Sequence, residues 1–289
     1  MKSDAFSGYH PAVNFLFFVG VIGFGVVIQH PAYLVAGCLA SAVYYLLLTG
    51  KKGLKLLGVT LAFFALISLV NPLLNHSGKH ILFRAFGKAY TLEALYYGMA
   101  LGAIFVIMML WFGCYSLVLT SDKFTALFGN LIPALSLLLV MVLRMIPAFT
   151  RKTKQIALAR QAIGKGLGQS KKLIHKAEGG ATILSALTDW ALEGSIVTAD
   201  SMRSRGYGTG GRTTFRIYRL TMRDALMLAL ILGMEISVLL AGGTGAVYTP
   251  KVKLDPIGWG FGVYCVLILI PTLVRVKEVL TWKILRSGI

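Results

Sequence analysis

Acidic residues are scarce in this chain, which has 11 Asp and Glu against 29 Lys and Arg and a formal net charge of +18. Its three cysteines, Cys38, Cys114 and Cys265, each lie within an apolar run, so neither a disulfide framework nor a cysteine-based zinc site is indicated. The sequence also lacks a G-x-x-x-x-G-K-[ST] phosphate loop, paired carboxylates and a Ser/His/Asp or Cys/His set. These absences argue against an enzyme, and no cofactor or metal ion is expected.

Apolar residues are abundant, with 56% hydrophobic residues and a mean hydropathy of +0.74. A soluble domain could not bury so much apolar surface, and a disordered chain would contain far less of it. Segments long and apolar enough to cross about 30 Å of hydrocarbon lie at about 11–29, 31–48, 56–74, 91–119, 223–241 and 256–274. The predicted fold is an all-α integral membrane protein with six transmembrane helices.

Charge counts predict the topology. An even number of spans places both termini on one side, and Lys and Arg are enriched in short cytoplasmic loops. With the termini inside, the inner segments carry eight Lys and Arg and the outer loops carry five. We therefore expect a multi-pass protein of the cell membrane with both termini cytoplasmic. The outer loop at 75–90 alternates weakly in polarity, a pattern compatible with a short hairpin.

The region between the fourth and fifth predicted spans carries most of the positive charge. Between positions 144 and 223 there are 15 Lys and Arg but only four acidic residues. The chain is therefore predicted to have three parts: spans one to four at 1–119, a cytoplasmic coupling region of long amphipathic helices at 120–222, and two closing spans with a short basic tail at 223–289.

Two long helices are predicted in this basic region. The first, at about 133–162, is expected to lie along the inner interface, with kinks at its two prolines, because its apolar start is too short to cross the membrane. In the second, at 182–202, the apolar residues fall within an arc of about 140° on a helical wheel. Only Leu192 and Ile196 break this apolar stripe.

Each predicted helix has an arginine close to a glycine that can end it. Arg160 comes shortly before Gly164, and Arg205 directly precedes Gly206. Such an arginine can complement the helix dipole, which contributes about 0.3–1 kcal/mol, or bind anionic lipid. Alternatively, it anchors the helix end in an acidic groove of another protein. The repetition of the pattern, together with the apolar stripe, favours a protein partner.

Around the second arginine, residues 199–208 read ADSMRSRGYG. This string resembles a signature of the transmembrane component of energy-coupling factor transporters. Members of that family carry two short Ala-Arg-Gly-type motifs, one at the end of each of two cytoplasmic coupling helices. The resemblance extends over essentially the whole chain and is most specific in the string at 199–208, ADSMRSRGYG. The two matching motifs are Ala159-Arg160-Gln161, where Gln replaces Gly, and Ser204-Arg205-Gly206, where Ser replaces Ala.

The resemblance implies a function. Arg160 and Arg205 would each insert into a groove on one of two ABC-type ATPase subunits. A small substrate-binding membrane subunit would dock on the apolar stripe, around Leu184, Leu187, Trp190 and Ala191. The chain would then be the non-catalytic coupling subunit of an ATP-driven importer of micronutrients such as vitamins or transition-metal ions, with hydrolysis on the partner subunits.

Two other functions compete with this one. Glu235 lies within the fifth predicted span, where an ionisable group is costly, so it could serve a proton- or cation-coupled secondary transporter. The absence of a Lys, Arg or His partner for it in the predicted spans favours a carboxyl hydrogen-bonded inside the helix bundle. The basic region could instead bind anionic lipid or nucleic acid through phosphates, but such binding does not require an apolar stripe. We therefore expect contact with the bilayer and no nucleic-acid partner.

Overall fold

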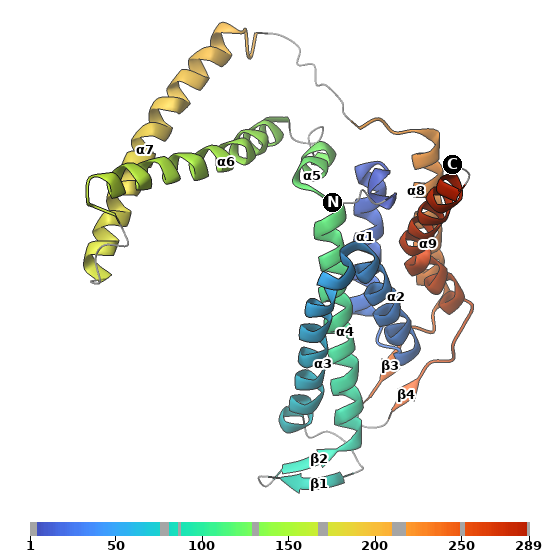
Figure 1. The fold of residues 1–289 in the computed structure, drawn as a ribbon. Helices are drawn as coiled ribbons and strands as arrows, with labels where there is room; N and C mark the ends of the chain where they lie inside the picture. The colour runs from blue at the N-terminus through green and yellow to red at the C-terminus, as the bar shows by residue number, and fades with distance from the viewer. Residues whose placement is uncertain are drawn as a thin grey trace. The chain divides into compact units, whose positions relative to one another are not determined.

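The computed structural model describes residues 5–75, 81–85, 88–128, 133–166, 173–209, 218–248 and 252–287, and helices make up most of them (Figure 1). The chain divides into two compact units. We call Met1–Phe124 together with Tyr218–Ile289 the membrane unit, and Thr125–Ile217 the helix-pair unit.

The membrane unit contains the long apolar helices. They are α1 (Pro11–Val27), α2 (Pro31–Thr49), α3 (Leu54–Leu74), α4 (Leu92–Val118), α8 (Met222–Ala241) and α9 (Gly260–Ser287), with short 3-10 turns at Phe6–Gly8 and Gly50–Gly53. Among the described residues, three helical stretches are long and apolar enough to cross a membrane: Pro31–Leu74, which contains α2 and α3, then Leu92–Val118 and Met222–Ala241. The chain is therefore a membrane protein.

The expected hairpin between α3 and α4 is present. Strands β1 (Ile81–Ala85) and β2 (Lys88–Thr91) pair antiparallel, while positions 76–80 and 86–87 of the predicted loop lie outside the described residues. A second small antiparallel pair, β3 (Ala246–Val247) and β4 (Lys253–Leu254), lies between α8 and α9.

Helices α1 and α2 are separated by only three residues, Ile28–His30, and the two helices begin alike. His10 and His30 each precede a helix whose first residue is proline. In both cases the histidine Nδ1 accepts a hydrogen bond, 3.2 Å long, from the backbone N–H two residues later. Proline suits this first position because its missing N–H would have no partner within the helix.

Aromatic rings form the centre of the membrane unit. The buried Trp111 of α4 has ring-centroid distances of 5.7 Å to Phe17, 6.0 Å to Phe18 and 6.1 Å to Tyr44. These contacts join α1, α2 and α4. Because apolar burial alone does not favour helix association within lipid, such close packing carries much of the stability of a membrane bundle.

Helices α3 and α4 lie side by side (Figure 1). Their backbones approach closely at Gly102, where an added Cβ would lie 2.9 Å from the ring of Phe64. At Gly98 an added Cβ would lie 2.9 Å from the carbonyl oxygen of Ser68. Small residues at such positions permit close helix packing in membranes.

The segment 5–10 contacts several helices, and we call it the N-terminal clasp. The buried ammonium group of Lys123 donates to the carbonyl oxygen of Ser7 and, at 2.6 Å, to its hydroxyl. The same ammonium group donates to the carbonyl oxygen of Val118 at 3.1 Å. The clasp is therefore attached to the end of α4.

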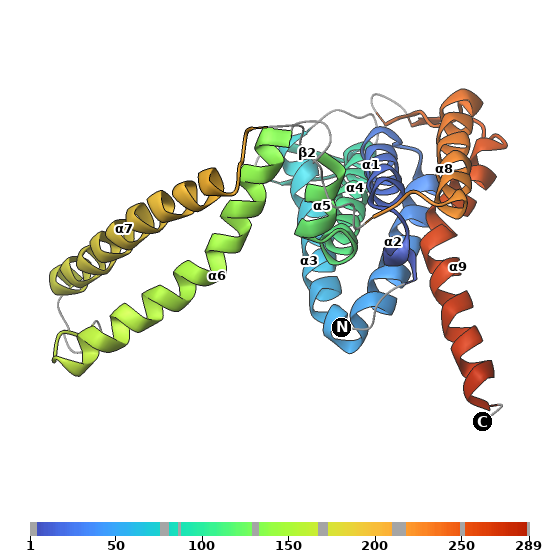
Figure 2. The same cartoon turned by 90° about the horizontal axis from the view of Figure 1, so that it is seen from above.

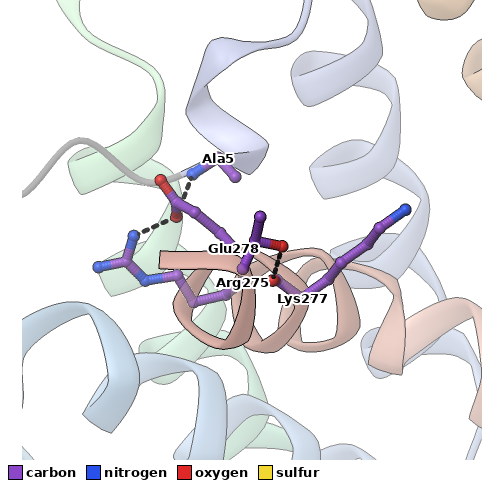
Figure 3. Close-up of polar contacts among 5 residues, drawn as sticks. Ala5, Arg275, Lys277 and Glu278 are labelled. Atoms are coloured by element: carbon purple, nitrogen blue, oxygen red, sulfur yellow. Dashed lines mark hydrogen bonds and ion pairs between the residues drawn. The ribbon is translucent and has the colours of Figure 1, made fainter. Parts of the chain in front are cut away.

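The clasp is also attached to α8 and α9. The N–H of His10 donates to Asp224 Oδ1 at 3.1 Å. The N–H of Ala5 donates to Glu278 Oε2 at 3.2 Å, and this carboxylate pairs with Arg275 at 2.5 Å (Figure 3). Three helices that are distant in the sequence thus share one short segment as their common support.

The helix-pair unit consists mainly of α6 (Pro133–Ala162) and α7 (Leu173–Ser204); the short α5 (Ser121–Phe128) leads into it. The bounds of α6 agree with the prediction, but Pro133 begins the helix and does not kink it, as suits a proline in the first turn. Helix α7 begins nine residues before the predicted Thr182. At 1.5 Å per residue its 32 residues extend about 48 Å.

Candidate functional site: two helix ends and an apolar stripe

The end of α6 is closed by a pair of backbone hydrogen bonds. The N–H of Lys165 donates to the carbonyl oxygen of Arg160 at 2.9 Å, and the N–H of Gly164 donates to that of Gln161 at 3.1 Å. Gly164 has φ of 75°, a left-handed conformation that suits glycine. Together these features form a Schellman motif.

The end of α7 repeats the same motif. The N–H of Tyr207 donates to the carbonyl oxygen of Met202 at 3.0 Å, and the N–H of Gly206 donates to that of Arg203, also at 3.0 Å. Gly206 has φ of 76°. The prediction that a left-handed glycine ends this helix is therefore confirmed, and the two helices end with matching backbones.

This shared backbone gives a structural register for the two predicted motifs. When Gly164 is matched with Gly206, the residue equivalent to Arg205 is Ile163, and the residue equivalent to Arg160 is Met202. Arg160 thus lies three positions earlier than Arg205, about 4.5 Å along the helix axis. The sequence match of Arg160 with Arg205 pairs two positions that are not structurally equivalent.

The environments of the two arginines also differ. Arg205 is exposed, whereas Arg160 is half-buried, and its Nε is buried without a hydrogen-bond partner among the residues that the structure describes. Ile163 is 70% exposed. The other predicted motif residues are exposed: Ala159, Gln161, Ser204 and Gly206.

Trp190, at the middle of the apolar stripe, packs against α6. Its ring lies edge-to-face on Phe149, with centroids 5.5 Å apart and planes at 87°. The ammonium group of Lys152 lies 5.7 Å from the centroid of the Trp190 ring, within cation–π range. Ile183 and Leu187, which precede Trp190 on the same side of α7, are buried. This part of the stripe is used within the chain.

The four residues predicted to bind another subunit therefore have different surroundings. Leu184 is 65% exposed, Leu187 is 8% exposed, and Trp190 and Ala191 are half-buried. Of the four, Leu184 offers the most open apolar surface. The pairing of Phe149 with Trp190 was not predictable, because an apolar stripe on one helix does not identify the helix that covers it.

The two helix ends extend equally far from this aromatic contact. Ile163 follows Phe149 by 14 positions, and Arg205 follows Trp190 by 15. At 1.5 Å per residue these separations correspond to about 21 Å and 22 Å along the helix axes. Figure 2 shows both helices along most of their length. We call the helical segment between the aromatic contact and the helix end an arm, and the arms of α6 and α7 have nearly the same length.

Glu235, the residue of the competing prediction, lies in α8 against α1. A Cβ at Gly20 would overlap its carboxylate, so the absence of a side chain there creates the space for Glu235. Its Oε1 is buried and has no hydrogen-bond partner within the described part of the chain. Among those same residues, no three His, Cys, Asp or Glu side chains gather as a metal site would require.

Neither the models of known protein families nor the curated proteins give a match to this chain. The resemblance to energy-coupling factor transporters therefore depends on the motifs in the sequence. The geometry adds a chemical property: an exposed guanidinium group at the end of a long helix can donate two parallel hydrogen bonds to a carboxylate.

Proposed function

We propose that this chain is the non-catalytic coupling subunit of an ATP-driven importer of the energy-coupling factor type, which takes up micronutrients such as vitamins or transition-metal ions. The observation that carries the proposal is the pair of long helices in the helix-pair unit, each closed by a Schellman motif, one of them ending at the exposed Arg205. Two such ends suit contact with two ATPase units.

In this proposal, the six long helices of the membrane unit are the transmembrane spans. Both chain termini and the helix-pair unit then face the cytoplasm, in agreement with the excess of Lys and Arg in the inner segments. ATP and its ATPases are also on that side. The short strand pairs β1–β2 and β3–β4 connect spans on the opposite side.

The packing of α6 on α7 suggests how motion would pass through the chain. Because Trp190 and Phe149 join the two helices, a displacement of either helix end tilts the pair about their contact. The remaining exposed apolar surface, including Leu184, would carry the substrate-binding membrane subunit. Closure and opening of the ATPases would thereby tilt or release that subunit.

The test is co-purification of ATPase activity with the tagged full-length chain from native membranes in mild detergent. We expect MgATP hydrolysis to be recovered with the wild-type chain. Arg205→Ala should lower the recovered activity roughly 10- to 100-fold, since a hydrogen bond to a charged group contributes about 1.5–3 kcal/mol. Lys176→Ala removes another exposed cation of α7 and is the matched control. Recovery of the wild-type chain without any ATPase would refute the proposal.

The buried carboxyl of Glu235 keeps one alternative open, a proton- or cation-coupled secondary transporter. In that case the purified chain alone, reconstituted in liposomes, would acidify or alkalinise the lumen when an ion gradient is imposed. Glu235→Gln would abolish the signal. The coupling-subunit proposal expects no ion flux from the chain alone and wild-type ATPase recovery in Glu235→Gln.

A further inference from the structure

The two helix ends share a backbone but carry different side chains. At four positions counted from the left-handed glycine, one end has a charged residue where the other has an uncharged one. The pairs, with α6 first, are Arg160 and Met202, Gln161 and Arg203, Ile163 and Arg205, and Lys165 and Tyr207. Although their frameworks match, the two ends are chemically distinct.

Ile163 and Arg205 make this contrast sharpest. Both directly precede the glycine, at the tips of arms of nearly equal length. Arg205 requires hydrogen-bond acceptors, whereas Ile163, at 70% exposure, becomes more stable when apolar atoms cover it. By a socket we mean the pocket on a partner that receives a helix end. If an acidic socket covered Ile163, its carboxylates would lose water without gaining a partner. If an apolar socket covered Arg205, the guanidinium group would lose water without gaining hydrogen-bond acceptors. One socket cannot serve both ends well.

We infer that the chain binds two ATPase units of different sequence: one with an acidic socket for Arg205, the other with an apolar socket for Ile163. This inference rests on the proposed function, because it requires an ATPase unit at each helix end. The two units can be separate chains or the two halves of one chain. Arg160, one turn earlier on α6 and half-buried, then lies beside the apolar socket and not within it.

A positive charge introduced at the tip of α6 tests the inference, because an apolar socket and an acidic socket predict different changes in the co-purified ATPase activity. In the full-length chain, Ile163→Arg should lower the co-purified ATPase activity about tenfold or more, because the apolar socket would have to accept a guanidinium group. Ile174→Arg is the matched control, since Ile174 is 71% exposed and lies outside both tips. If both sockets were acidic, Ile163→Arg would instead raise or preserve the recovered activity, and the inference would be wrong while the proposed function stood.

Crosslinking then identifies what each tip contacts. A photoreactive amino acid is placed at position 163 or at position 205, and the crosslinked peptides from native membranes are sequenced by mass spectrometry. The expected result is one nucleotide-binding sequence from position 163 and a different one from position 205. The same peptide from both positions would overturn the inference alone. Absence of nucleotide-binding peptides from both positions would overturn the proposed function with it. Gel filtration of each variant checks that the chain remains folded.

Discussion

In the membrane unit several of the largest side chains form a fully buried aromatic core, whereas in the helix-pair unit many apolar side chains lie on the surface. Trp111 of the membrane unit is fully buried among other aromatic rings. In α7, by contrast, Leu184, Leu192, Ile196 and Val197 are all exposed. Lipid accounts for exposed apolar residues on a transmembrane helix, but α7 also carries a charged face.

This contrast indicates how each unit is stabilised. The membrane unit has an aromatic core and the N-terminal clasp, which together can define its structure without a partner. In the described part of the helix-pair unit there is one aromatic contact, Phe149 with Trp190, and a few buried residues lie beside it. We conclude that the membrane unit is stabilised mainly by contacts within the chain. Under the proposed function, the helix-pair unit would acquire much of its stability from the partner subunits.

The largest effect should come from the core of the membrane unit. Replacing Trp111 by Ala removes a ring that contacts both α1 and α2, and such substitutions cost about 3–5 kcal/mol. Unfolding of the purified chain by SDS, followed by circular dichroism, should shift to a clearly lower midpoint. Trp282→Ala is the control, since Trp282 is exposed. Equal shifts for the two variants would mean that the membrane unit lacks a specific core.

A second substitution tests the N-terminal clasp. Lys123→Met preserves much of the side-chain volume but removes the ammonium group that donates to Ser7 and to the carbonyl oxygen of Val118. Leaving buried acceptors without this donor should cost about 1–3 kcal/mol in the same assay. Lys51→Met changes an exposed lysine and should have little effect. If Lys123→Met behaved like Lys51→Met, the clasp would not contribute to the scaffold.

Most helices could be predicted from the sequence because apolar runs and proline or glycine boundaries depend on local chemistry. The predicted start of α7 at 182 is too late, since the helix continues through Gly179 and Gly180 and buries Gly179. The last helix extends beyond its predicted end at 274 because its polar continuation is also helical, where Arg275 pairs with Glu278 one turn later.

The candidate site was less predictable. Arg160 was matched with Arg205 because both are arginines near a glycine. Structural equivalence between the two helix ends instead follows from the backbone hydrogen bonds that close each Schellman motif around its glycine. The spacing Ala162-Ile163-Gly164 was the available signal, since it parallels Ser204-Arg205-Gly206 once side-chain identity is ignored. The covering of Leu187 and Trp190 depends on a second helix and could not be inferred from one stripe.

The smallest expected effect concerns the aromatic contact of the helix-pair unit. Trp190→Ala removes the edge-to-face pair with Phe149, which contributes about 0.5–1.5 kcal/mol beyond apolar burial. Because α6 and α7 show no large core along their described residues, hydrogen exchange should accelerate within these two helices and remain unchanged in the membrane unit. Trp259→Ala, at an exposed tryptophan, should leave both patterns unchanged. Faster exchange in α1 or α4 of Trp190→Ala would show that the two units unfold together, and the contrast between them would fail. If hydrogen exchange in α6 and α7 became slow again when ATPase units were added, the result would show that these partners stabilise the helix pair.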